Sequence, residues 1–88
     1  MKRLHLIIKG EVQGVFFRDY VKKSAGVLRG WVRNNPDGTV EAVAEGSEEE
    51  LKKFLEKCSK GPEPAVVERI EKGWSDAKKE FDSFEILQ

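Results

Sequence analysis

Apolar side chains near the start of the chain follow first the spacing of a strand and then that of a helix. Every second residue from Leu4 to Ile8 is apolar, which predicts a half-buried strand that ends at Gly10. From Phe17 onward apolar positions return every three or four residues, which is the spacing of an amphipathic helix. Because Gly26 interrupts this run, we expect the helix to end there.

The middle of the chain has the pattern of a β-hairpin. Residues 30–34 (GWVRN) and 39–45 (TVEAVAE) have the composition of strands, and the turn sequence NPDG stands between them. Pro-Asp-Gly favours a tight reversal, because proline presets one φ angle and glycine accepts a positive one. We therefore expect two adjacent antiparallel strands joined by this turn.

A second helix is indicated by signals at both of its ends. Ser47 is a favourable N-cap residue, and Glu50 lies three positions later, at the spacing of a capping box. The pair Gly61-Pro62 is typical of residues that follow a helix. Between these ends the apolar residues form one stripe, which consists of Leu51, Phe54, Leu55 and Cys58. Its place in the stripe predicts that Cys58 is a core residue rather than a reactive thiol.

The last third of the chain predicts two more strands. In residues 65–74 the apolar spacing shifts between Val67 and Ile70, which indicates a strand with a bulge, and Phe84 and Ile86 alternate in a short final strand. The order is then βαββαβ plus one strand. Such an order predicts an α+β fold, in which an antiparallel sheet carries two helices on one face. With 88 residues, we expect a single domain over residues 1–88.

Composition and charge narrow the functional classes. Lys and Arg number 16, as do Asp and Glu, and a net charge of zero argues against a large basic surface for nucleic acid. His5 and Cys58 are the only residues of their kinds, which excludes an internal disulfide and argues against a zinc cluster or a Cys–His nucleophile. The apolar segment LHLII is too short for a signal peptide or a membrane span, so we expect a cytoplasmic protein.

The stretch GEVQGVFFR, residues 10–18, has the features of an anion site. A strand leads into a turn with two glycines, and the turn leads into a helix, so backbone N–H groups and the positive end of the helix dipole point to one place. Arg18 at the start of the helix adds a planar guanidinium that suits phosphate or carboxylate. An ordinary strand–helix turn with a surface arginine explains the same residues. The stretch is not a P-loop, because no G-K-[ST] follows.

Two longer motifs resemble the signatures of the acylphosphatase family. The first runs from Ile8 to Arg18 (IKGEVQGVFFR) and the second from Gly30 to Gly46 (GWVRNNPDGTVEAVAEG). Further likeness lies in GPEPAVV, from Gly61, and in the final FEI, so the resemblance extends over nearly the whole chain. It implies a ferredoxin-like α/β sandwich and an acylphosphatase activity, the hydrolysis of acyl phosphates to carboxylate and inorganic phosphate, with no metal and no cofactor.

The resemblance also implies roles for the residues that match the motifs. Arg18 would bind the phosphoryl group and Asn34 would hold the attacking water, so these are the expected catalytic residues. Backbone amides ahead of Arg18 would cradle the phosphate; the residues concerned are Glu11, Val12, Gln13, Gly14, Val15, Phe16 and Phe17. The side chain of Gln13 would shape this loop rather than react.

The implied partners are small molecules, with an acyl phosphate as substrate and inorganic phosphate as product and inhibitor. We expect a monomer that binds neither nucleic acid nor a membrane. Two departures from the family pattern bear on the site. The first helix is about half a turn short near Gly26, which affects where Asn34 lies, and Glu11 places a negative charge in the anion loop.

Two other functions are compatible with such a fold. The first is a non-catalytic module that binds acyl or carbamoyl phosphate, like the acylphosphatase-type domain inside larger maturation proteins. The second is an RNA-binding ferredoxin-like module, which would require exposed aromatic residues on a basic sheet. The strand sequence GTVEAVAEG contains no aromatic residue, so the sequence disfavours the second alternative.

Overall fold

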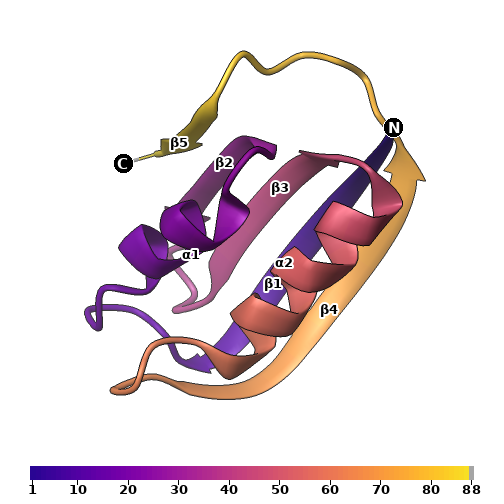
Figure 1. Ribbon diagram of the computed structural model, residues 1–88. Helices are drawn as coiled ribbons and strands as arrows, with labels where there is room; N and C mark the ends of the chain where they lie inside the picture. The colour runs from indigo at the N-terminus through magenta and orange to yellow at the C-terminus, as the bar shows by residue number, and fades with distance from the viewer. Residues whose placement is uncertain (88) are drawn as a thin grey trace.

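Five strands and two helices follow one another in the predicted order. The computed structural model describes residues 1–87 and places both helices on one face of a single sheet (Figure 1). The elements are β1 (Lys2–Glu11), α1 (Phe17–Ala25), β2 (Arg29–Asn34), β3 (Val40–Gly46), α2 (Glu48–Lys60), β4 (Val66–Asp76) and β5 (Phe84–Ile86). The ferredoxin-like arrangement of βαββαβ with a short additional strand is therefore confirmed.

The strands lie in the order β4-β1-β3-β2-β5. The pairs β1–β3, β1–β4 and β2–β3 are antiparallel, as predicted, whereas β5 pairs in parallel with β2 and makes the sheet mixed. The reason is the path of the chain after β4. It leaves β4 at the end of the sheet where β2 begins, crosses that end and starts β5 there (Figure 1).

The core lies between the sheet and the helices. Side chains of β1, β2 and β3 that face the helices are fully buried; they include Leu4, Leu6, Ile8, Val32, Val40, Ala42 and Ala44. The helices contribute Phe17, Val21 and Ala25 from α1 and Leu51, Phe54 and Cys58 from α2. The apolar stripe predicted for the second helix is thus its buried face, and Cys58 is a core residue. Burial raises the pKa of its thiol to about 12.

The helix ends agree with their sequence signals. The Ser47 hydroxyl accepts a hydrogen bond from the backbone N–H of Glu50 at 3.1 Å, so Ser47 is the N-cap of α2. Gly61 directly follows α2, and Gly26, with φ 57°, directly follows α1. Within residues 1–87, neither helix is long and apolar enough to cross a membrane.

The predicted bulge in β4 explains one of the two glycines in the anion turn. Lys9 pairs with Arg69 and Gly10 pairs with Val67, so Glu68 is the extra residue. Gly10 has φ 135°, and a Cβ atom there would lie 2.1 Å from the carbonyl oxygen of Val66. The close approach of β4 therefore accounts for this glycine, which takes a positive φ as glycine readily does.

The connector between β4 and β5 is held by a buried carboxylate. Glu45, 4% exposed, accepts hydrogen bonds from the backbone N–H groups of Lys78 and Lys79 at 2.9 and 3.0 Å and from Nε of Arg3 at 2.8 Å. Burial alone would raise the pKa of this carboxyl, but the two amides and the guanidinium together hold the pKa below its usual range. This anchor holds the connector backbone at Lys78 and Lys79 against the end of β3.

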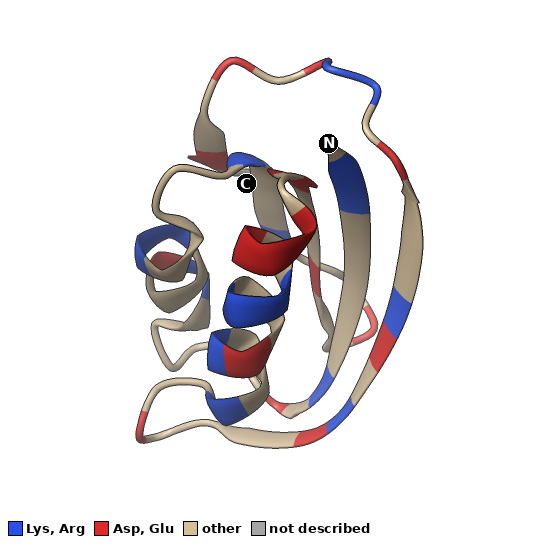
Figure 2. Cartoon of the chain, turned by 45° about the vertical axis from the view of Figure 1, so that its right-hand side comes forward, with Lys and Arg blue, Asp and Glu red and all other residues tan. Residues whose placement is uncertain are grey.

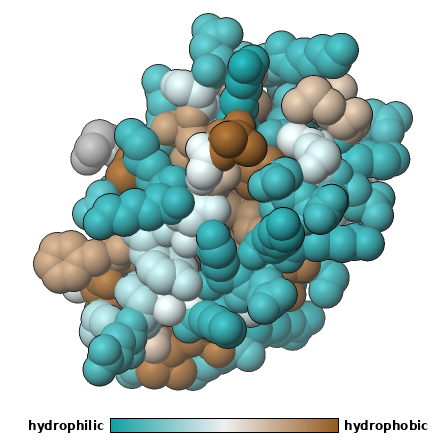
Figure 3. Space-filling view, viewed as in Figure 1, coloured by the Kyte–Doolittle hydropathy of each residue, from teal (hydrophilic) through white to brown (hydrophobic). Residues whose placement is uncertain are grey.

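The surface carries charges of both signs. Basic and acidic residues alternate along α2 and along β4 (Figure 2), and the helix face is mostly hydrophilic with small separate apolar patches (Figure 3). The first turn of α2 carries three glutamates (Glu48–Glu50) and its last turn carries Lys57 and Lys60, which is the favourable arrangement of charges on the helix dipole. Among the described residues, the exposed large apolar side chains are Met1, Phe16, Val27, Val66 and Trp74.

Candidate active site

The loop between β1 and α1 takes two left-handed backbone conformations. Gly14 has φ 72°, which suits glycine because it lacks a Cβ atom. Phe16 has φ 61° and ψ 25°, which is uncommon for a residue with a large side chain, and it occupies the N-cap position of α1. Its ring cannot accept hydrogen bonds from the first amides of α1, whereas the Ser47 hydroxyl does so for α2. The N-terminus of α1 therefore keeps donors that can bind an anion.

The sheet register places Asn34 beside this loop. Ile8 near the end of β1 and Asn34 at the end of β2 pair with the same residue, Val40, from its two sides. Directly opposite residues lie on one face of a sheet, so Asn34 faces the helices, as the buried side chains of Ile8 and Val40 do. The end of β2 and the loop that follows β1 thus share one end of the sheet.

Arg18 is the second residue of α1 and is half-buried. Its Nη1 atom donates a long hydrogen bond, 3.4 Å, to the carbonyl oxygen of Leu87, just after β5. The guanidinium therefore lies between the N-terminus of α1 and the fifth strand.

One pocket of about 410 Å³ brings most of the predicted site residues together. The residues from the prediction that line it are Val12, Gly14, Phe16, Phe17, Arg18 and Asn34. The short first helix has not separated Arg18 from Asn34. Glu11, Gln13 and Val15 do not line this pocket; Glu11 is exposed and pairs with Val66 of β4, so its charge lies in the strand rather than at the pocket wall.

Two lining residues, Asp19 and Ile86, were not predicted from the sequence. Asp19 follows Arg18 directly, so its position in the first turn of the helix was the signal available for it. Ile86 enters through the parallel pairing of β5 with β2, where it lies opposite Val32. No local pattern indicates that pairing.

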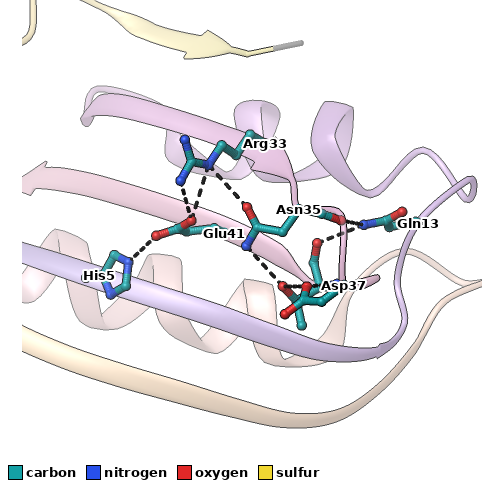
Figure 4. Close-up of polar contacts among 7 residues, drawn as sticks. His5, Gln13, Arg33, Asn35, Asp37 and Glu41 are labelled. Carbon is teal, nitrogen blue, oxygen red and sulfur yellow. Dashed lines mark hydrogen bonds and ion pairs between the residues drawn. The ribbon is translucent and has the colours of Figure 1, made fainter.

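Gln13 connects the loop to the β2–β3 turn, although it lies outside the pocket lining. Its Nε2 atom donates to the carbonyl oxygens of Asn35, at 2.7 Å, and Thr39, at 2.9 Å (Figure 4). The turn is itself ordered, because Asp37 accepts hydrogen bonds from the backbone N–H and the hydroxyl of Thr39. These hydrogen bonds from Thr39 hold the pKa of Asp37 below its usual range. Gln13 thus joins the loop to the hairpin that carries Asn34.

The same network continues along the strands, away from the pocket. Arg33 donates to Asn35 Oδ1 and to Glu41, and Nε2 of His5 lies 2.5 Å from Oε2 of Glu41 (Figure 4). Partial burial acts to raise the pKa of Glu41, but its hydrogen bonds with His5 and Arg33 lower the pKa overall. His5 is therefore a structural residue of the sheet face. Among residues 1–87, no group of three or more His, Cys, Asp or Glu side chains is placed to hold a metal ion.

Comparisons with known proteins agree with this geometry. The acylphosphatase family model matches residues 4–86. An acylphosphatase of Pyrobaculum islandicum is 53% identical over 97% of this chain and 93% of its own length. The crystal structure of acylphosphatase from Bacillus subtilis, 37% identical, superposes with a TM-score of 0.96 over the full length of both chains. The chain is also similar to 12% of T. kodakarensis HypF, with a TM-score of 0.85, 37% identity and 99% of this chain covered. The match over nearly its whole length shows that the chain belongs to the acylphosphatase family.

Proposed function

We propose that the chain hydrolyses the carboxyl–phosphate bond of acyl phosphates without a metal, with Arg18 and the loop amides as the phosphate site and Asn34 as the residue that positions water. The observation that carries this proposal is the shared pocket. Arg18 from α1 and Asn34 from β2 line the same cavity beside the uncapped N-terminus of α1.

The chemistry requires few functional groups. A carboxylate leaves an acyl phosphate without prior protonation, so no general acid is needed. Phosphoryl transfer depends mainly on positioning and on stabilisation of charge. The guanidinium and the amides of the 11–17 loop supply the charge stabilisation, and one preorganised donor is typically worth roughly 10²–10³ in rate. Asn34 holds water in line with the bond that breaks.

The proton of the water has a simple route in this proposal. An amide is a poor base, so Asn34 orients the water through a hydrogen bond and does not take its proton. The proton passes to a phosphoryl oxygen of the substrate or to solvent. The products are the free carboxylate and inorganic phosphate.

The proposal also covers the domain organisation, oligomeric state and location of the protein. Residues 1–88 act as a single domain and as a monomer in the cytoplasm, without nucleic acid or membrane partners. The balanced charge and the single buried cysteine support this view. The alternative, a non-catalytic module that binds acyl or carbamoyl phosphate, is disfavoured because relatives matched over nearly the full length are named acylphosphatases.

Benzoyl phosphate hydrolysis by the wild type, Arg18→Lys and Asn34→Ala tests the proposal. Lysine keeps the charge but loses the planar donors, so Arg18→Lys should weaken both phosphate binding and turnover. Asn34→Ala should bind phosphate with near wild-type affinity in calorimetry while kcat falls by roughly a hundredfold or more. Circular dichroism must first show that both variants are folded.

The possible outcomes separate the functions. Phosphate binding by the wild type without turnover would indicate the binding module. Normal turnover by Asn34→Ala, or loss of phosphate binding in that variant, would refute the role given to Asn34.

A further inference from the structure

The phosphate site leaves part of the pocket for the other half of the substrate. The cavity of about 410 Å³ lies within the range of roughly 300–1,000 Å³ that small-molecule sites occupy. Within it, the loop amides, Arg18 and Asn34 belong to the proposed phosphate site. The remaining wall therefore determines which acyl groups fit.

Phe16 belongs to this remaining wall, and the fold does not explain it. Its side chain is 79% exposed, whereas that of Phe17, the next residue, is 2% exposed in the core. Phe16 also holds a left-handed backbone, which is strained for a residue other than glycine. The ring of Phe16 adds little to the core, and its backbone is strained. Because this residue lines the pocket, we infer that its ring contacts what the pocket binds.

Ile86 supplies a second apolar side chain from a distant part of the chain. In β5 the side chains of Phe84 and Ile86 point to the helix side of the sheet; Phe84 is buried, whereas Ile86 is half-buried and lines the pocket. The pocket wall thus receives Phe16 from the N-terminus of α1 and Ile86 from the last strand. Two apolar side chains from such separate segments favour an apolar group in the pocket.

Asp19 disfavours a negatively charged acyl group in the pocket. Asp19 lines the same pocket one residue after Arg18. An acyl group that carries its own negative charge would meet this carboxylate, and like charges in a partly enclosed site repel. An uncharged acyl group avoids that cost.

We propose that Phe16 and Ile86 form an acyl-binding wall, and that the protein selects acyl phosphates whose acyl group is apolar and uncharged. This inference rests on the proposed function, because it assigns the acyl half of the same substrate. Phe16 and Ile86 are specificity-determining residues and take no part in bond breaking.

The test compares kcat/KM for three substrates: benzoyl phosphate, acetyl phosphate and succinyl phosphate, which carries a second, charged carboxylate. The wild type should prefer benzoyl phosphate over both others. In Phe16→Ala and in Ile86→Thr the benzoyl-to-acetyl ratio should fall about tenfold, within the discrimination that apolar pockets supply. Val27→Ala is the matched control, because Val27 is 81% exposed and lies outside the pocket. It should leave the ratio unchanged.

The outcomes separate this inference from the proposed function. Hydrolysis of all three substrates by the wild type without preference, or a ratio that neither variant changes, would overturn the acyl-binding wall and leave the activity in place. Absence of hydrolysis of every substrate would overturn both. A fall in the ratio for Phe16→Ala or Ile86→Thr but not for Val27→Ala would support the wall, since general loss of structure lowers both rates together.

Discussion

Replacing Gln13 with methionine tests how much the fixed conformation of the loop between β1 and α1 contributes to catalysis. Methionine has similar length and volume but cannot donate the hydrogen bonds to the carbonyl oxygens of Asn35 and Thr39. Both carbonyls keep a backbone partner, because Asn35 O still accepts from Gly38 N and Thr39 O from Asn35 N. The substitution therefore releases the loop without leaving a carbonyl unsatisfied.

The size of the effect follows from these two bonds. A neutral hydrogen bond contributes about 0.5–1.5 kcal/mol net, so the pair favours the held loop by about 1–3 kcal/mol. Every 1.4 kcal/mol corresponds to about a tenfold change, so we expect kcat/KM for benzoyl phosphate to fall by roughly 5- to 150-fold. The inhibition constant for inorganic phosphate should rise by a similar factor, because the loose loop holds substrate and product less well.

Steady-state kinetics with phosphate as inhibitor measures kcat/KM and the inhibition constant. Thermal unfolding measures the stability of each variant. Tyr20→Phe is the control, because the Tyr20 hydroxyl donates to the backbone carbonyl of Lys57 at 2.9 Å, away from the pocket. It should lower the melting temperature by a few degrees and leave kcat/KM within about twofold. If Gln13→Met keeps wild-type phosphate affinity, or if Tyr20→Phe loses as much activity, the hydrogen bonds of Gln13 do not position the loop.

Four further predictions concern the site and the rest of the molecule. Inorganic phosphate should inhibit competitively and EDTA should leave the activity unchanged; activity lost on chelation and restored by Mg²⁺ or Zn²⁺ would contradict the metal-free mechanism. Glu45→Gln should destabilise the fold by about 2–4 kcal/mol at neutral pH, as measured by urea unfolding with Glu56→Gln as control. Because the folded pKa of Glu45 is lowered, this difference should be complete above the ordinary glutamate pKa of about 4.3 and vanish as the pH falls through the folded value. Cys58, whose buried thiol has a pKa raised to about 12, should stay unlabelled by iodoacetamide at pH 8 until the protein is unfolded.

The elements were predictable because their signals are local. The Ser47 cap, Gly26 after α1 and the shifted spacing near Val67 each involve residues a few positions apart, and the structure agrees with all three. The role of Gly10 was not predictable in this way. Only contact with Val66, 56 positions later, shows why a side chain is excluded there.

The meeting of Arg18 and Asn34 shows most clearly what a single sequence lacks. The NPDG turn sets the register of β2 on β3, and the apolar alternation sets the face of each strand, so the side of the sheet on which Asn34 lies follows from local pattern. Which element lies beside Asn34 cannot be predicted from local pattern, because no local signal indicates that β1 pairs with the other side of β3. Once that pairing exists, Ile8 and Asn34 flank Val40 in one row, and the loop after β1 must reach the end of β2. The family resemblance assigned Arg18 and Asn34 to one site in advance. Ile86 reaches that site through the parallel pairing of β5 with β2, and it lay outside the residue roles that the resemblance implied.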